Sequence, residues 1–330
     1  MKEARKVVRA LLIILLVSYL GLGQAQKTDK PQKSREDALE LESDLVTLDI
    51  VATDAKGNII RDLKREDFQL LQDDQPEKIE FFEKGFHPEQ RPIAAVFALD
   101  MSGSIEPGLG QVQEQQASAQ QFMKLLDKDS EFAVIAFNNE IHILQNFTND
   151  EKRIANAFRK ASAVGGSTRI YDAVDRAITM LKKVQNTRDG RRLRRVVIVV
   201  TDGYDSSSII DLKELTRRAN DANVTIYSIT IPNYQGMPNG QKRRAMTLLD
   251  LSELIPHTGG MDYSADTYDF SPIFKSIKEE VGASYTLAFY PSAGSRTDGK
   301  FHTLNVKTNR PGIILRLSKQ GFQGANKSHS

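Results

Sequence analysis

The pattern of apolar and polar positions divides the chain into a central part and two flanks. Between residues 91 and 282, apolar runs of strand length alternate with segments of helical periodicity. Fully apolar runs are typical of strands buried on both faces, and they occupy residues 93–99 and 196–200; a third strand of this kind is expected at 225–231. Helices are expected at 112–126, 170–181, 212–222, 246–255 and 270–277. Repeated β-α units predict an α/β fold: a doubly wound, mostly parallel sheet with helices on both faces.

Both flanks carry apolar residues at every second position, which is typical of strands with one buried face. The pattern starts at Val46 in segment 43–88 and at Tyr285 in segment 283–322. Neither segment has enough strands to bury a face alone. We therefore expect the two segments to pair into one small β-sandwich-like domain, into which the central domain is inserted. Two independent β appendages are the alternative.

The first 25 residues have the parts of a secretory signal peptide. A basic stretch ending at Arg9 precedes an apolar stretch at 10–20, and small residues occupy positions 23 and 25. A retained membrane anchor is the alternative, although the apolar stretch is short for a spanning helix of about 20 residues. Residues 26–42 are polar, which predicts a flexible leader, and 323–330 are expected to be a disordered tail. We thus expect a secreted, periplasmic or cell-envelope protein with no membrane span after cleavage.

Composition narrows the possible functions. The chain has 45 Lys and Arg against 43 Asp and Glu, and removing the first 25 residues leaves a net charge of −1. No basic field therefore favours nucleic-acid binding. The chain has no cysteine, which excludes disulfides and thiolate zinc sites and, in an exported protein, favours a bacterial origin. It also has no Gly-x-Ser-x-Gly elbow and no phosphate-binding glycine loop.

Oxygen-bearing side chains cluster around three of the predicted elements. Asp100, Ser102 and Ser104 follow the first apolar strand, Thr168 precedes the helix at 170, and Asp202 follows the strand at 196–200. Because ligands bind at the carboxyl ends of strands in such sheets, we expect these side chains to lie together. Carboxylates and hydroxyls are ligands for Mg²⁺, Mn²⁺ or Ca²⁺. The sequence predicts a divalent-cation site; helix-capping hydroxyls and loop acids are the alternative.

These five residues, with the Gly-Gly-Ser-Thr loop and Thr-Asp-Gly, resemble the metal-ion-dependent adhesion site (MIDAS) of von Willebrand factor A-type (VWA) domains. The whole chain resembles the exported bacterial VWFA-related proteins of the Acidobacteria type. The resemblance implies Mg²⁺, or Mn²⁺ or Ca²⁺, as cofactor and a protein partner that presents Asp or Glu. It also implies that Ser102, Ser104 and Thr168 ligate the ion directly, with Asp100 and Asp202 binding directly or through water.

A second set of residues is expected to border the cation site and to form a partner-binding rim: Glu106, Asp205, Tyr234, Met237, Lys242 and Arg243. A solvated loop acid, a helix cap and a mobile loop at 232–244 are the alternatives for this set. We interpret Asp172, in the first turn of a predicted helix, as structural. The basic run 188–195 is expected to be a solvent-exposed loop.

These observations favour an exported, non-enzymatic binding module that uses a divalent cation to hold an acidic group of a protein partner. The function would be adhesion or the assembly of envelope or extracellular complexes. A structural scaffold, in which the cation ties loops together, is one alternative. A metal-assisted hydrolase is a weaker one, because no general base or second metal cluster accompanies the predicted site.

Overall fold

The computed structural model describes residues 45–85, 91–102, 109–161, 165–188, 190–202, 205–231, 234–236, 242–244, 250–265, 267 and 269–325. The predicted signal peptide and leader lie outside these residues, as do Ser104, Glu106 and Met237. Within the described ranges, no helix has the length and apolar character needed to cross a membrane.

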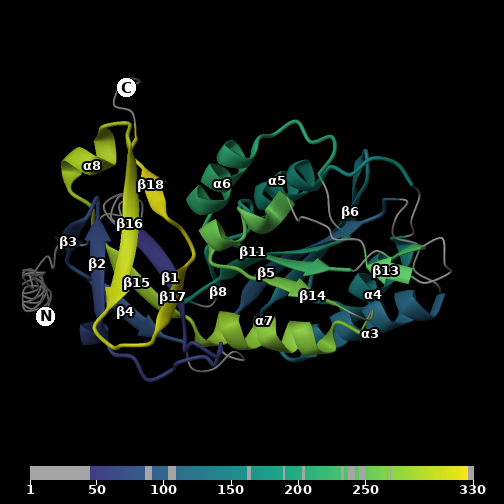
Figure 1. Cartoon of the computed structure of the whole chain (residues 1–330), viewed down its shortest axis with the longest axis horizontal. Helices are drawn as coiled ribbons and strands as arrows, with labels where there is room; N and C mark the ends of the chain where they lie inside the picture. Colours follow the sequence, from purple (N-terminus) through teal and green to yellow (C-terminus); the bar gives the residue numbers. More distant parts are fainter. Residues whose placement is uncertain are drawn as a thin grey trace, which may run out of the picture. The chain divides into compact units, whose positions relative to one another are not determined.

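The central part of the chain forms a six-stranded sheet (Figure 1). Its strands follow one another in the order β14 (Asp262–Ser264), β11 (Val224–Thr230), β10 (Arg194–Thr201), β5 (Ile93–Asp100), β6 (Glu131–Phe137) and β7 (Ile141–Thr148). All neighbouring pairs are parallel except β6 and β7, which form an antiparallel edge. The predicted mostly parallel α/β sheet is confirmed.

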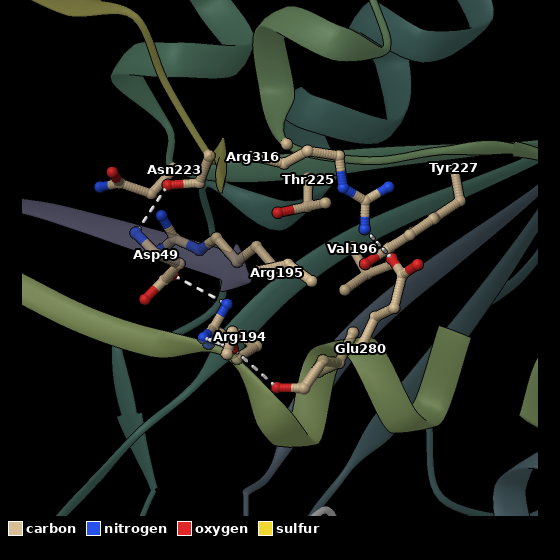
Figure 2. A pocket seen from close by; sticks show the side chains of 14 residues that line it. Asp49, Arg194, Arg195, Val196, Asn223, Thr225, Tyr227, Glu280 and Arg316 are labelled. Carbon is tan, nitrogen blue, oxygen red and sulfur yellow. Dashed lines mark hydrogen bonds and ion pairs between the residues drawn. The ribbon is translucent and has the colours of Figure 1, made fainter. Parts of the chain in front are cut away.

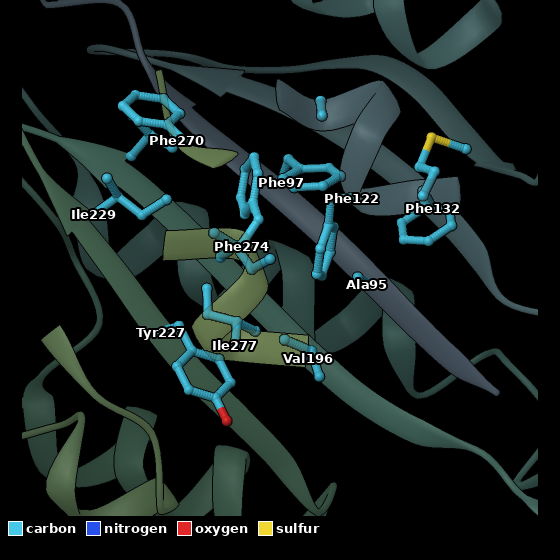
Figure 3. Close-up of a cluster of buried hydrophobic side chains, with 14 of the residues drawn as sticks. Ala95, Phe97, Phe122, Phe132, Val196, Tyr227, Ile229, Phe270, Phe274 and Ile277 are labelled. Carbon is cyan, nitrogen blue, oxygen red and sulfur yellow. The ribbon is translucent and has the colours of Figure 1, made fainter. Parts of the chain in front are cut away.

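Helices cover both faces of this sheet, because the side chains of its buried strands alternate between two apolar clusters. One face packs against α3 (Leu109–Lys124), α4 (Glu151–Lys160) and α7 (Ser271–Ala283), and the other against α5 (Ile170–Leu181) and α6 (Leu212–Asp221). On the first face, Phe97 lies 5.8 Å from Phe274 and 6.2 Å from Phe122 between ring centroids (Figure 3). These contacts fix the central strand against two helices.

The helix predicted at 246–255 differs from the structure over its described part. The chain there forms one short 3-10 turn, η3 (Asp250–Ser252), and a second, η4 (Pro256–Thr258), follows directly after the predicted range. Pro256 lacks an N–H to continue a helix, and Gly259 adopts a φ of +74° that ends the second turn. Apolar spacing alone did not distinguish these buried turns from a helix.

The two flanks form two further four-stranded sheets, each of which contains strands from both ends of the chain. The first has the order β17 (Ile314–Leu317), β1 (Val46–Thr53), β15 (Tyr285–Phe289), β4 (Phe81–Lys84). The second has the order β18 (Gly321–Gln323), β16 (Phe301–Thr308), β2 (Phe68–Gln72), β3 (Gln75–Glu77). Their facing side chains share one buried cluster, so the predicted sandwich built from both flanks is confirmed.

The remaining described elements are short: η1 (Arg65–Asp67), α8 (Ala293–Thr297), and the two hairpins β8 (Thr187–Arg188) with β9 (Arg191–Arg192) and β12 (Tyr234–Gly236) with β13 (Lys242–Arg244). The C-terminal boundary also needs a correction. The amides of Gly324 and Ala325 donate to backbone carbonyls of Lys300 and Arg296. Residues 323–325 therefore belong to the fold and not to the predicted tail.

Ion pairs join the sandwich to the α/β part, and each part contributes both an acidic and a basic partner (Figure 2). Asp49 of β1 lies 2.7 Å from Arg192 and 3.0 Å from Arg194, and Arg316 of β17 lies 2.7 Å from Glu280 of α7. Burial alone would raise the pKa of Asp49, but the two arginines outweigh it and hold that pKa well below its usual range.

The basic run 188–195 therefore differs from the expected solvent-exposed loop. Arg194 is buried in β10, and Arg191 pairs with Asp127 and Asp129. A basic run can mark a junction because each guanidinium carries several donors that satisfy carboxylates on neighbouring elements. A small pocket of about 10 Å³ lies at this junction, beside the amino ends of β10 and β11 and so at the opposite edge of the sheet from Asp100.

Candidate functional site

The candidate site lies where the strand order of the central sheet changes direction. After β5 the chain continues through α3 to β6 on one side, and after β10 it continues through α6 to β11 on the other. The carboxyl ends of β5 and β10 thus border the crevice in which doubly wound sheets bind ligands. Asp100 ends β5, and Asp202 directly follows β10.

Hydrogen bonds from two directions fix the carboxylate of Asp100. Its Oδ1 accepts the backbone N–H of Ser102 at 2.8 Å, and its Oδ2 accepts the hydroxyl of Thr201 at 2.6 Å. The first bond turns the chain sharply after β5, which brings Ser102 back to the end of the strand. The second bond ties β5 to β10. Because each carboxylate oxygen has two acceptor positions, both oxygens retain capacity for a cation.

Two acids are buried together at this point. Asp100 is 7% exposed and Asp202 is 8% exposed. Burial raises the pKa of the Asp100 carboxyl, the hydrogen bonds from Thr201 and Ser102 oppose the rise, and the negative charge of Asp202 adds to it. Like charges held close in a buried site repel each other, and a bound cation would offset this repulsion. The electrostatics of the described residues thus fit a cation.

Thr168 reaches the site on a loop that two glycines shape. Gly165 and Gly166 have φ values of +81° and +108°, and a Cβ on Gly166 would lie 3.0 Å from Oδ1 of Asn139. The Thr168 amide donates to the Ser206 hydroxyl at 2.9 Å, and the Ser206 amide donates to the Thr168 carbonyl at 2.9 Å. These bonds tie the Thr168 loop to the segment that follows Asp202.

The donors fit a hard divalent cation better than a softer metal. No group of three or more His, Cys, Asp or Glu side chains capable of holding a metal is found in the described ranges. The available donors are carboxylates and hydroxyls, which suit Mg²⁺, Mn²⁺ or Ca²⁺. The structure brings Asp100, Ser102 and Asp202 to one sheet edge and connects Thr168 to it through Ser206. The predicted ligand Ser104 lies outside the described residues.

Only some residues of the predicted partner-binding rim lie within the described ranges. The backbones of Tyr234, Lys242 and Arg243 lie in the β12–β13 hairpin, where Tyr234 pairs with Arg244. Asp205 makes structural bonds: its Oδ1 accepts the Tyr171 amide at 3.3 Å in the first turn of α5. A partner-binding role for these residues remains a prediction.

Three further residues shape the site through hydrogen bonds that the sequence pattern did not predict, although Thr201 lies in the Thr-Asp-Gly motif. Ser206 and Thr201 make the bonds described above, and Asn138 accepts the Arg169 amide at 3.1 Å while donating to the Gly165 carbonyl at 2.9 Å. Asn138 directly follows β6, so the rule that polar residues at strand ends belong to the site would have found it. Asp172 has the structural role expected of it, pairing with Arg169 at 2.8 Å.

Comparisons with known proteins identify the family of the central part. Residues 95–253 match the family model of the von Willebrand factor type A domain, and this range contains Asp100, Ser102, Thr168 and Asp202. No curated protein matches the chain.

Solved structures similar to this chain include three proteins of different sources. An aerotolerance-related membrane protein from Bacteroides fragilis is 14% identical, with a TM-score of 0.44 over 57% of this chain and 98% of its own. A von Willebrand factor type A protein from Catenulispora acidiphila is 11% identical, with a TM-score of 0.46 over 80% and 74%. Proximal thread matrix protein 1 from the mussel byssus, with a zinc-occupied MIDAS motif, is 16% identical, with a TM-score of 0.44 over 60% and 47%.

Proposed function

Since residues 95–253 form a von Willebrand factor type A domain, we propose that this domain binds an acidic group of a protein partner through one divalent cation. Domains of this family are known for protein interaction through a MIDAS and are generally non-catalytic. The observation that carries the proposal is the pair of buried acids, Asp100 and Asp202, at the switch point of the sheet.

The proposed ion is Mg²⁺, with Mn²⁺ or Ca²⁺ as substitutes. Asp100, Ser102, Ser104, Thr168 and Asp202 would hold it, and the ion would supply a positive centre for a carboxylate from outside. Mg²⁺ gives up its waters reluctantly and is commonly bound by few protein groups, so a ligand position can remain open to a partner. An Asp or Glu side chain of a protein is the partner group that fits this position.

The proposed location is the cell envelope or the extracellular space, and the support for it is the signal-like pattern of residues 1–25. In this location, adhesion or the assembly of a surface complex would follow from metal-dependent binding. The alternative is a scaffold whose ion only ties the Thr168 loop to the ends of β5 and β10. Hydrogen bonds of Ser206 and Thr201 already join these loops. Because the chain's own side chains hold the loops together, an ion is not needed for this purpose, and the binding function is favoured over the scaffold.

Metal titration of the purified protein tests the proposal. We expect isothermal calorimetry with Mg²⁺ or Mn²⁺ to give one bound equivalent, and we expect none in the double variant Asp100→Ala, Asp202→Ala. Asp62→Ala is the matched control, because the Asp62 side chain is 72% exposed and lies on the sandwich. Unchanged stoichiometry in the double variant would exclude a cation site at these residues.

The binding role has its own experiment. Envelope proteins are passed over the immobilised wild-type protein and over Thr168→Ala, in Mg²⁺ and in EDTA. We expect one specific partner to bind the wild type in Mg²⁺. We expect it not to bind the wild type in EDTA, and not to bind the variant in either condition. Full capture in EDTA, with a metal-dependent melting temperature, would instead support the scaffold alternative.

A further inference from the structure

An isoleucine beside the candidate site is largely exposed to solvent. The side chain of Ile209 is 85% exposed, whereas the next residue, Ile210, packs partly buried against the cluster under α5 and α6. Single exposed apolar residues are common on protein surfaces, so exposure alone carries no conclusion. What distinguishes Ile209 is how firmly its backbone is held.

The carboxylate of Asp172 holds this backbone. The Ile209 amide donates to both oxygens of Asp172 at 3.1 Å, and the Ile210 amide donates to Oδ1 at 3.1 Å. Arg169 pairs with the same carboxylate at 2.8 Å. Asp172 lies in the first turn of α5, so the loop that carries Ile209 is fixed to a rigid helix.

The preceding serines complete the attachment of the loop. Ser208 accepts the Asp172 amide at 3.1 Å, and Ser207 hydrogen-bonds to the Ser167 hydroxyl at 3.0 Å. Ser206 makes the two bonds to Thr168 already described. Serine side chains are small, and Ser206 and Ser207 are exposed, so they do not cover the isoleucine that follows them. The loop presents one apolar side chain above a polar surface.

We propose that Ile209 is an apolar contact for the partner, and that the partner is a peptide segment with an apolar side chain close to its acidic one. This inference rests on the proposed function of the cation site. Binding to a preorganised group loses little conformational entropy, and Ile209 is preorganised by the bonds to Asp172. Covering its side chain removes apolar surface from water, which adds to the contact made by the acid.

Chain connectivity places Ile209 near the Thr168 loop. Ile209 is three residues from Ser206, which spans at most about 11 Å, and Ser206 contacts Thr168 directly. An extended peptide rises about 3.3 Å per residue. We therefore search for the apolar side chain within three positions of the acid, on either side of it.

A displayed peptide library tests this inference. Each peptide has one fixed Asp with three random positions on both sides, and selection uses the purified full chain in Mg²⁺. We expect enrichment of Leu, Ile, Val, Met or Phe within three positions of the Asp. We expect this enrichment to disappear with Ile209→Ser and to persist with Ile314→Ser, a control whose side chain is 54% exposed on β17. Equal enrichment on Ile209→Ser, or failure to enrich any peptide, would overturn the inference.

The affinity of one enriched peptide separates this inference from the proposed function. We expect Ile209→Ser to raise the Kd of the peptide about tenfold or more, and to leave the Mg²⁺ stoichiometry and the melting temperature unchanged. Thr168→Ala, by contrast, removes Mg²⁺-dependent binding altogether. If Thr168→Ala and EDTA leave binding intact, the cation site is not the binding site. If Ile209→Ser does not weaken peptide binding while Thr168→Ala and EDTA abolish it, the proposed apolar contact is wrong and the cation site is unaffected.

Discussion

The hydroxyl of Thr201 donates to Oδ2 of Asp100 at 2.6 Å, and this bond joins the carboxyl ends of β10 and β5. Thr201 is fully buried, so water cannot replace the donor easily. We expect Thr201→Val, which keeps the shape and removes the hydroxyl, to lower the free energy of unfolding by about 1–3 kcal/mol. Denaturant unfolding in EDTA measures this change.

Thr230→Val is the control for the Thr201 variant. The Thr230 hydroxyl donates to Asp262 at 3.0 Å at the end of the neighbouring strand β11, so its removal deletes a comparable bond that does not involve Asp100. We expect Mg²⁺ affinity to fall in Thr201→Val and to stay unchanged in Thr230→Val. The Thr201 bond has no role in the site if both variants bind Mg²⁺ as the wild type does.

The buried pair Asp100 and Asp202 predicts opposite effects of one substitution on stability and on metal binding. Asp202→Asn removes a negative charge that raises the pKa of Asp100, so the metal-free protein should become more stable. The same variant should lose the stabilisation that a bound ion gives, which is about 2.7 kcal/mol at a hundred times Kd. Thermal unfolding with and without Mg²⁺ measures both effects. A variant that is less stable in EDTA and equally stabilised by Mg²⁺ would contradict the charge argument.

The sequence predicted the architecture well because the buried strands follow simple periodicities. The runs at 93–99 and 196–200 are apolar at every position, which requires helices on both faces. The grouping of Asp100 and Asp202 followed from strand order alone, because parallel strands end at one sheet edge. Both features depend on local pattern and general topology, so one sequence was sufficient.

Other features depend on contacts between distant residues and were not predictable in this way. The bond from Ser206 to Thr168 spans 38 residues, and the ion pair from Asp49 to Arg192 spans 143. No local pattern distinguishes an arginine on a surface loop from one that meets a carboxylate of another sheet. The basic run at 188–195 was therefore interpreted as solvent-exposed, and its role at the junction became visible only with the fold.

The junction gives a third prediction, which concerns stability. Asp49 is 6% exposed and pairs with both Arg192 and Arg194. Burial lowers the pKa of Arg194 to about 10 although Asp49 opposes this effect. Asp49→Asn leaves buried positive charge without a partner, so we expect a loss of about 3–5 kcal/mol in the free energy of unfolding.

Asp62→Asn is the control for the junction, because its pair with Arg310 at 2.9 Å lies at the surface and should contribute about 0–1 kcal/mol. Acid titration gives a second measurement. A depressed pKa stabilises the fold above the unfolded value near 3.8, and this contribution is lost as the pH falls through the folded value. The acid-induced loss of stability should therefore be smaller in Asp49→Asn than in the wild type.

A histidine in the sandwich gives the last prediction, a change of stability with pH. Nδ1 of His302 lies 2.6 Å from Asp73 and Nε2 lies 3.1 Å from Asp298, so the imidazolium joins the turn after β2 to the loop after α8. The hydrogen bond to Asp73 is the main cause that raises the pKa of His302 above its usual 6.5, against the effect of burial. A raised pKa stabilises the fold fully below pH 6.5, and this contribution is lost as the pH rises through the folded value.

We therefore expect the free energy of unfolding to fall between pH 6 and pH 8.5, and we expect His302→Gln to remove most of this fall. His142→Gln is the control, because the His142 side chain is 48% exposed on the edge strand β7 and lies 3.6 Å from Glu140. Urea unfolding at the two pH values measures the difference, and a proton NMR titration of the His302 ring measures its pKa directly. If His302→Gln loses as much stability as the wild type over this range, another group causes the change. A His302 pKa at or below 6.5 would contradict the stabilising role of Asp73, because the ring would then gain nothing from its two carboxylates.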